Sequence, residues 1–201
     1  MNIFYLDSNP QTCAQMHNDK HCIKMILEYS QLLSTAHRVL DGTESVVVAN
    51  GRKKKTWRLD DDRDSNIYSA THINHPSAIW VRNSLSNYMW LSHLLIELCK
   101  EYTYRYGKTH KCESSGLAKM LIDRVPNNIP QGKFTEPTPA MPDEYKVSDD
   151  SITSYRNYYI NAKQHLAEWK GKINSRNVPL WYKEGILDLL AENAQELGLG
   201  Y

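Results

Sequence analysis

Apolar residues recur at intervals of three and four over several long stretches of the chain, the spacing expected of helices with one buried face. In the first stretch, Cys22, Ile26, Tyr29 and Leu33 fall in one such stripe. Prolines at positions 10 and 76 suit the first turn of the first two helices. The pattern predicts three long helices, over about residues 10–40, 76–107 and 151–170. It also predicts a short helix over about residues 115–124 and a C-terminal helix over about residues 183–197.

Between the first two stretches the pattern changes to SVVVANGRKKKTWRL, two β-prone arms around Asn50-Gly51. Asn-Gly is a strong hairpin signal, because a type I′ turn needs a positive φ angle at both central residues. We therefore expect a small β-hairpin over about residues 44–60. Its second arm carries a basic run, RKKK at 52–55. Such a strand can extend a nucleic-acid-binding surface or simply protect a sheet edge from aggregation.

Most of the prolines fall in VPNNIPQGKFTEPTPAMPDEY, within about residues 125–150. This stretch predicts a long loop, and long loops inside compact domains are usually functional or mobile. A chain of 201 residues can bury a sizeable core but is short for two domains. Since no internal repeat is present either, the sequence indicates a mainly α fold in a compact single domain, residues 1–201.

Charge and cysteine usage narrow the class of protein. The 24 Lys and Arg residues balance 23 Asp and Glu residues, so any nucleic-acid footprint must be local. No leader-like segment and no run of membrane-spanning length is present, which predicts a cytoplasmic protein without a membrane partner. No zinc-finger spacing links the cysteines, so we expect free, mostly buried thiols at Cys13, Cys22, Cys99 and Cys112.

The stretch MHNDKHCIKMILE offers the first candidate chemistry. On a helix, His17, His21, Lys24, Glu28 and Gln31 lie within a sector of about 80°, opposite the apolar stripe, and Lys20 borders that sector. Imidazole exchanges protons near neutral pH, and a lysine can contact phosphate or form an imine. A solvated polar face is the alternative interpretation. The candidate catalytic residues are His17, Lys20, His21, Lys24 and Glu28.

A metal site at this position is disfavoured. His17 and His21 have the i, i+4 spacing of a zinc pair, but Asn18 stands where a metalloprotease needs its glutamate. Two lysines in the same patch also oppose a divalent cation. We therefore predict neither a metal nor a cofactor.

The second candidate site is NHPSAIWVR. If Pro76 is the first helical residue, His75 occupies the cap, and the adjacent amides carry partial positive charge that suits a phosphate. The alternative is that these residues only cap the helix. The candidate phosphate-binding residues here are Asn74, His75, Arg82, Asn83 and Asn87.

The third candidate site lies in SYRNYYINAKQHLAEWKGKINSRNVPLWYKEG, where basic residues alternate with aromatic ones. Nucleic-acid-binding proteins use this combination, because basic side chains neutralise the phosphate backbone and aromatic rings stack on the bases. Packing of the rings in the core is the alternative. The candidate substrate-binding residues are Arg156, Tyr159, Lys163, Trp181 and Tyr182.

Short blocks scattered through most of the chain carry a resemblance to a known family. DKHCIKMILEYSQLL and NHPSAIWVRNSLSNYMWL resemble uncharacterised phage and bacterial relatives of the phage-type pyrimidine-dimer DNA glycosylase and abasic-site lyase, endonuclease V. MPDEY and PLWYKEG are similar to the dimer glycosylase itself. The resemblance implies a mainly helical fold whose first helix lies in a DNA groove. It also implies amine attack on C1′ of an extruded nucleotide, with β-elimination breaking the strand.

Two features depart from this family. Its nucleophile is an α-amine freed when Met is removed before a small residue, whereas Asn2 follows Met1 here. Its catalytic glutamate lies early on the first helix, where the alignment places His21, with Glu28 two turns further along. The resemblance therefore implies a DNA-directed fold and surface with altered chemistry.

Three functions remain open. The first is a DNA- or nucleobase-directed glycosylase or lyase with Lys20 or Lys24 as the amine and His17 or His21 as the acid–base. The second is an enzyme that acts on a nucleotide or another small phosphorylated molecule. The third is a non-catalytic nucleic-acid-binding protein. DNA is the expected partner, and the sequence leaves the oligomeric state open.

Overall fold

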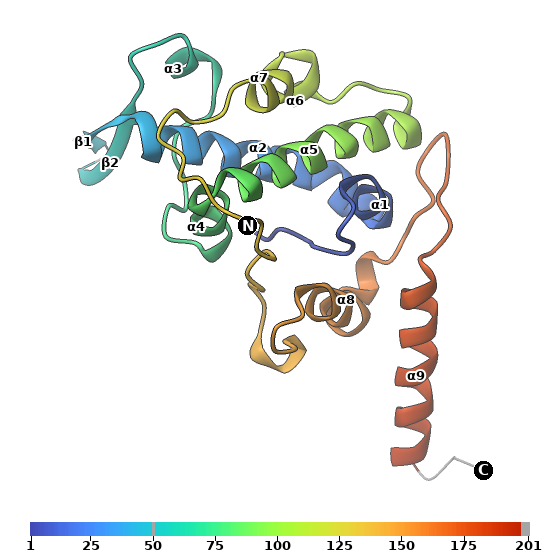
Figure 1. Ribbon diagram of the computed structural model, residues 1–201. Helices are drawn as coiled ribbons and strands as arrows, with labels where there is room; N and C mark the ends of the chain where they lie inside the picture. The colour runs from blue at the N-terminus through green and yellow to red at the C-terminus, as the bar shows by residue number, and fades with distance from the viewer. Residues whose placement is uncertain (50, 198–201) are drawn as a thin grey trace.

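The computed structural model describes residues 1–49 and 51–197, which form a mainly α fold with one antiparallel hairpin, as predicted (Figure 1). Asn50, predicted in the hairpin turn, lies outside the described residues. In chain order the elements are α1 Pro10–Met16, α2 Asp19–Asp41, β1 Thr43–Ala49, β2 Arg52–Arg58, α3 Arg63–Asn66, α4 Pro76–Asn83, α5 Leu85–Tyr106, α6 Lys111–Ser114, α7 Leu117–Asp123, the 3₁₀ turn η1 Asp143–Tyr145, α8 Ser151–Ala162, the 3₁₀ turn η2 Gln164–Leu166 and α9 Leu180–Glu196.

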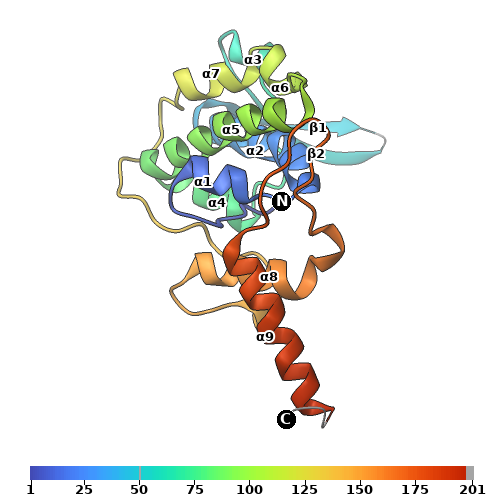
Figure 2. The ribbon, with the colours of Figure 1, turned by 90° about the vertical axis from the view of Figure 1, so that its right-hand side faces the viewer.

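Helices α2 and α5 lie side by side at the centre of the core, with α1, α4 and α7 packed around them (Figures 1 and 2). Residues 3–6, which the sequence left open between a strand and an apolar lead-in, form a buried lead-in beside α2 and α8. All four cysteines are free and buried, as predicted. Within the described part of the chain, no helix is long and apolar enough to cross a membrane.

The first two predicted helices are each divided in the structure. His17 ends α1 and Asn18 starts α2, where the Asn18 Oδ1 atom accepts the His21 backbone N–H at 2.8 Å. Ser84 adopts an extended conformation (φ −154°, ψ 152°) between α4 and α5, and its hydroxyl accepts the Asn87 backbone N–H. A short polar side chain at each break satisfies an amide at the start of the next helix, which favours a new helix over continuation. The prediction of two uninterrupted helices was wrong at these points.

The third predicted helix is also shorter than expected, because α8 ends at Ala162 rather than near residue 170. Both Lys170 and Gly171 donate backbone N–H groups to the Asp19 carboxylate, which ties this irregular segment to α2. The chain then reaches α9, which packs against α8 at its start and projects away from the rest of the molecule (Figure 2).

The hairpin and the Pro-rich loop both occur where the sequence predicted them. Strands β1 and β2 pair in the register Ala49↔Arg52, and Gly51 has the positive φ of 72° that the turn requires. The loop is ordered by specific contacts. The Asn87 Oδ1 atom accepts the Thr135 backbone N–H at 3.0 Å, and the Asp41 carboxylate accepts the backbone N–H groups of Asn127 and Asn128.

Candidate functional site

His17 and His21 lie in a buried hydrogen-bond network rather than on an outward face. His17 Nδ1 is 2.8 Å from the Cys13 carbonyl, and its Nε2 is 2.9 Å from the Tyr29 hydroxyl. His21 Nδ1 is 2.5 Å from the Tyr159 hydroxyl, and its ring stacks on Phe4 at 4.0 Å. The two histidines therefore join α1, α2, α8 and the N-terminal lead-in.

This burial corrects the predicted outward polar stripe, which assumed a single straight helix through both histidines. Burial is the main cause that lowers the pKa of His17 to about 4 and that of His21 to about 2. Both rings are neutral at pH 7, and His17 is fully enclosed. His17 thus has a structural role and cannot contact a substrate.

These shifts predict that stability is lost in mild acid. The unfolded chain takes up a proton on each histidine near pH 6.5, whereas folded His17 and His37 resist protonation until about pH 4. The free energy of unfolding should thus hold its full value above pH 6.5 and fall below it, by about 1.4 kcal/mol per pH unit for each histidine. Urea unfolding of the His17→Gln variant between pH 4.5 and 7.5 should show a slope shallower by about one proton.

Replacement of His93, which is exposed on α5, by glutamine is the matched control and should keep the slope of the unsubstituted protein. An equal slope in the His17→Gln variant would contradict a neutral, buried imidazole at position 17.

Two of the other candidate catalytic residues, Lys24 and Glu28, belong to a separate cluster around the Glu28 carboxylate. Lys24, one helical turn earlier, places its Nζ atom 3.1 Å from one oxygen of Glu28. The α-amine of Met1 lies 4.0 Å from the other oxygen. The Lys24 side chain is 70% exposed, whereas those of Met1 and Glu28 are 6% and 14% exposed. One carboxylate is therefore flanked by two primary amines, and that of Lys24 is carried on an exposed side chain.

His75 adjoins this cluster from the start of α4. Its Nδ1 atom accepts the Ser77 backbone N–H at 3.2 Å, so the predicted cap is confirmed. The pKa of His75 is lowered by burial and by the positive charges of the Met1 amine and His72, while the negative charge of Glu28 opposes this. His75 is therefore within electrostatic reach of both the amine and the carboxylate.

The remaining residues predicted around α4 have different positions. Arg82 donates to the Ile73 carbonyl at 2.7 Å and braces the turn that presents His75. Asn87 is buried and holds the Pro-rich loop through Thr135. Asn74 and Asn83 are exposed. Arg82 and Asn87 thus support the structure around the site, and the i, i+4 pair of Asn83 and Asn87 does not form because Ser84 separates their helices.

The predicted aromatic and basic surface near the C-terminus is largely used in packing. Tyr159 and Tyr182 are buried, and Trp181 packs 6.0 Å from the Tyr159 ring. Arg156 donates to the Leu6 carbonyl and lies 5.3 Å from the centre of the Trp181 ring. Lys163 lies 4.7 Å from the centre of the Tyr158 ring. The expectation of an open stacking platform is therefore corrected, since the rings instead join α8 and α9 to the core.

The sequence analysis missed the Met1 amine as a partner of Glu28. The signal was the apolar segment IFYL directly after Met1-Asn2, which has to be buried and therefore fixes the preceding residues against a helix. Lys20, the other candidate amine, is exposed two turns before Glu28 on α2. Across residues 1–49 and 51–197, no group of three or more His, Cys, Asp or Glu side chains could hold a metal ion.

Comparison with known proteins does not assign this site. A scan against models of known families, a search of curated proteins and a search of solved structures each gave no match to this chain. The function is therefore argued from the arrangement of Lys24, Glu28, Met1 and His75.

Proposed function

We propose that this protein is a DNA-directed enzyme of the glycosylase/lyase type, in which a primary amine beside Glu28 forms an imine with the sugar of an extruded nucleotide. The observation that carries the proposal is one carboxylate flanked by two amines, with Lys24 at 3.1 Å and the Met1 amine at 4.0 Å. An amine next to a proton acceptor is what imine formation requires. The resemblance of the sequence to the pyrimidine-dimer glycosylases supports DNA as the substrate.

In this reaction the amine nitrogen bonds to C1′ of the deoxyribose and passes a proton to Glu28. The bond from C1′ to the damaged base breaks, and the base leaves with the electron pair and takes up a proton. The C1′–O4′ bond then breaks, O4′ takes a proton, and the C1′=N imine forms. At an abasic site the amine adds to the open-chain aldehyde instead, and water leaves as the imine forms. Loss of a proton from C2′ of the imine then breaks the C3′–O bond and releases the downstream strand with its phosphate. Water hydrolyses the remaining imine and frees the amine.

The exposed face of α2 around Glu28 suits a nucleic acid. Lys20 and Lys24 supply positive charge, and next to them on the helix are Ile23 and Leu27, whose exposed fractions are 41% and 40%. Exposed apolar side chains of this kind pack against bases that leave the stack, and lysines neutralise the phosphates on either side. A small phosphorylated substrate would use the charges but not the apolar residues.

Borohydride trapping on duplex DNA tests the proposal. The protein is incubated with a duplex that contains one abasic site, and with ultraviolet-irradiated duplex, in the presence of sodium borohydride. We expect a covalent protein–DNA adduct and, without borohydride, a nicked strand. Proteolysis and mass spectrometry of the adduct should locate the reduced imine on Met1 or on Lys24.

Heat-denatured protein is the control, because it contains the same amines and reacts only through non-specific encounters. The Lys24→Arg variant separates the two amines, since it keeps the positive charge and removes the primary amine. Absence of both adduct and nicking with the folded protein would overturn the proposal. In that event, binding of a small phosphorylated compound, or DNA binding without chemistry, would favour one of the other two functions.

A further inference from the structure

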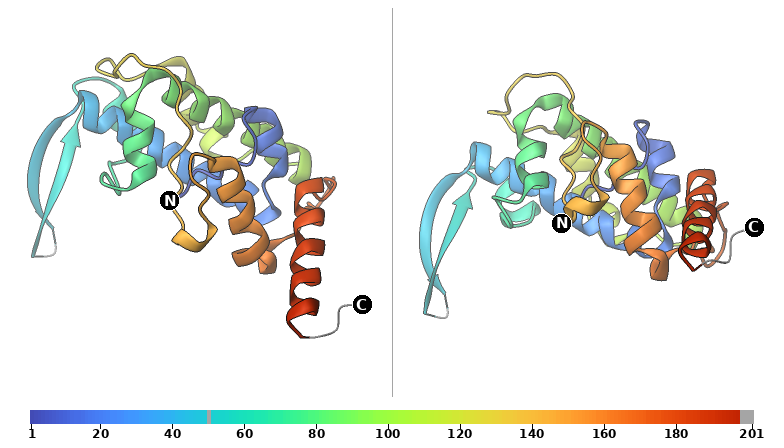
Figure 3. Two further views of the ribbon diagram at one scale, coloured as in Figure 1. Left: turned by 60° about the horizontal axis from the view of Figure 1, so that its bottom comes forward. Right: turned by 90° about the horizontal axis from the view of Figure 1, so that it is seen from below.

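The β1–β2 hairpin extends beyond the helical body at the C-terminal end of α2 (Figure 3). Its base is firmly held. Arg38 donates to the Trp57 carbonyl at 3.1 Å and pairs with Asp64, which also binds Arg58 at 2.9 Å. Trp57 itself is buried against the body. The distal part of the hairpin is therefore an exposed ribbon on a fixed base.

The composition of this ribbon is unusual for a free surface. Strand β1 exposes Val46, Val47 and Val48, with exposed fractions of 57%, 41% and 71%. Strand β2 exposes four consecutive basic residues, and Lys55 pairs with Glu44 at 2.7 Å. For the other three, Arg52, Lys53 and Lys54, the described residues provide no ion pair. Exposed valines contribute little to the stability of an isolated two-stranded hairpin. A surface that combines exposed valines with basic residues is suited to a polyanionic partner that also offers apolar groups.

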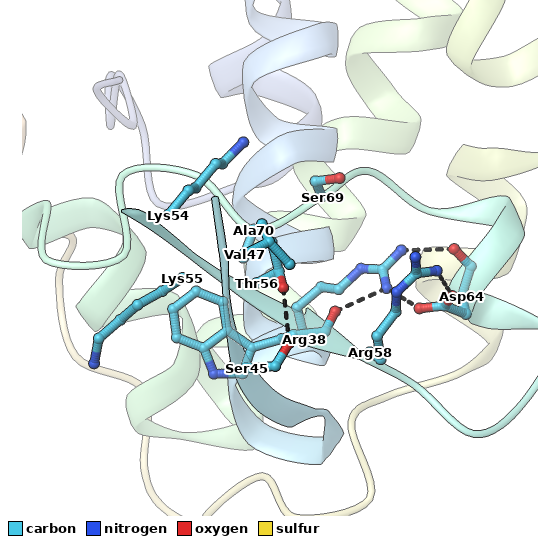
Figure 4. Close-up of a pocket in the computed structure, with 11 residues that line it drawn as sticks. Arg38, Ser45, Val47, Lys54, Lys55, Thr56, Arg58, Asp64, Ser69 and Ala70 are labelled. Carbon is cyan, nitrogen blue, oxygen red and sulfur yellow. Dashed lines mark hydrogen bonds and ion pairs between the residues drawn. The ribbon is translucent and has the colours of Figure 1, made fainter. Parts of the chain in front are cut away.

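A groove lies beside the hairpin. It has a volume of about 510 Å³ between β2 and residues 68–73, and its lining includes Lys54, Lys55, His72 and Gln31. Gln31 is on α2, three positions after Glu28, so one wall of the groove lies about one helical turn from the amine–carboxylate cluster. In the adjoining pocket, Lys54 and Lys55 point away from the cluster of Arg38, Arg58 and Asp64 (Figure 4). The Lys54 ammonium group, which has no ion pair among the described residues, can thus meet a ligand in the groove, whereas that of Lys55 is paired with Glu44.

We propose that the β1–β2 hairpin is a DNA-binding arm, which holds the phosphate backbone of the duplex on one side of the nucleotide bound at Glu28. This inference rests on the proposed function for its choice of DNA. A two-stranded ribbon fits a duplex groove, in which lysine and arginine contact phosphates and valines contact sugars and base edges. A mononucleotide at Glu28 would not reach the exposed end of the arm.

Binding to an undamaged duplex tests this arm without requiring any chemistry. The variant Arg52→Gln, Lys53→Gln, Lys54→Gln removes three cations and leaves the Lys55–Glu44 pair in place. Each lost phosphate contact reduces the steepness of log K against log salt by about 0.9, so the slope should become shallower by about 2–3. At 100 mM salt we expect the dissociation constant for a 25-bp duplex to rise by roughly tenfold or more, because three phosphate contacts are lost.

The control variant is Lys108→Gln, Lys111→Gln, Lys119→Gln, which makes the same change of net charge at exposed positions on or beside α5–α7. It should alter the slope by less than half as much. Equal effects of the two triple variants would overturn the arm, because only net charge would then matter. Equal competition by single-stranded RNA or by an acidic polypeptide would also overturn it.

The arm and the proposed function can fail separately. Trapping and nicking with an unchanged salt slope in the arm variant would remove the arm and keep the enzyme. A shallower slope without any trapped adduct would keep the arm and remove the lyase chemistry.

Discussion

Glutamine in place of Glu28 is expected to slow strand nicking at an abasic site by about 10²–10⁴-fold, the usual contribution of a positioned proton acceptor. Glutamine has nearly the same size and can still contact Lys24, but it cannot take the proton from an attacking amine. The single-turnover rate on an abasic duplex, measured with enzyme in excess, reports this step without interference from product release.

The matched control for this variant is Glu97→Gln. Glu97 pairs with Lys100 at 2.6 Å on α5, a helical Glu–Lys pair of the same kind away from the candidate site. Its replacement should leave the nicking rate unchanged. If Glu28→Gln nicks as fast as the unsubstituted protein while the adduct still forms, Glu28 has no part in the proton transfer, and the candidate site is wrongly placed.

Leucine in place of Arg105 is expected to lower the free energy of unfolding by about 3–5 kcal/mol, the cost of removing one partner from a buried ionic network. The Arg105 side chain is fully buried between two carboxylates. Its Nε atom lies 2.6 Å from Glu101, and its Nη1 atom lies 3.0 Å from Asp19. Without the guanidinium, both carboxylates lose a charged partner inside the protein. The free energy is measured by urea unfolding at pH 7.

An exposed ion pair provides the comparison for this prediction. Lys119 and Asp123 pair on α7, with exposed fractions of 78% and 51%, so Lys119→Leu should cost less than about 1 kcal/mol. If the Arg105→Leu variant does not fold, Asp19→Asn gives a measurable intermediate, because it keeps the arginine paired with Glu101. A loss for Arg105→Leu no larger than that of Lys119→Leu would show that the network contributes little to stability.

Features with local signals could be predicted from the sequence. The hairpin follows from Asn-Gly between two β-prone arms, and the cap of α4 follows from His75-Pro76. The helix breaks at Asn18 and Ser84 were missed although both are good cap residues. The apolar periodicity continues across both residues. A periodic pattern does not reveal where a side-chain oxygen accepts a backbone N–H and so begins a new helix.

The candidate site was predictable only where its contacts are local in the sequence. Lys24 and Glu28 are one turn apart on a single helix, so their pairing follows from local geometry. The Met1 amine reaches Glu28 only because residues 3–6 are buried beside α2, which is a tertiary contact. His17 and His21 were assigned to the outward face because their hydroxyl partners, Tyr29 and Tyr159, cannot be deduced from spacing along a helix.

The burial of the N-terminal lead-in has a consequence for the order of folding. Arg156 on α8 holds the Leu6 carbonyl across 150 positions of sequence, and Phe4 packs edge-on against Tyr155 and Tyr159. Contacts between such distant segments form late, because a large loop must close before they contribute. During synthesis, α1 to α7 can pack while Met1 and its neighbours are still uncovered. The lead-in that follows Met1 is thus fully covered only once α8 has left the ribosome, which makes the surroundings of the candidate site one of the last parts of the molecule to mature.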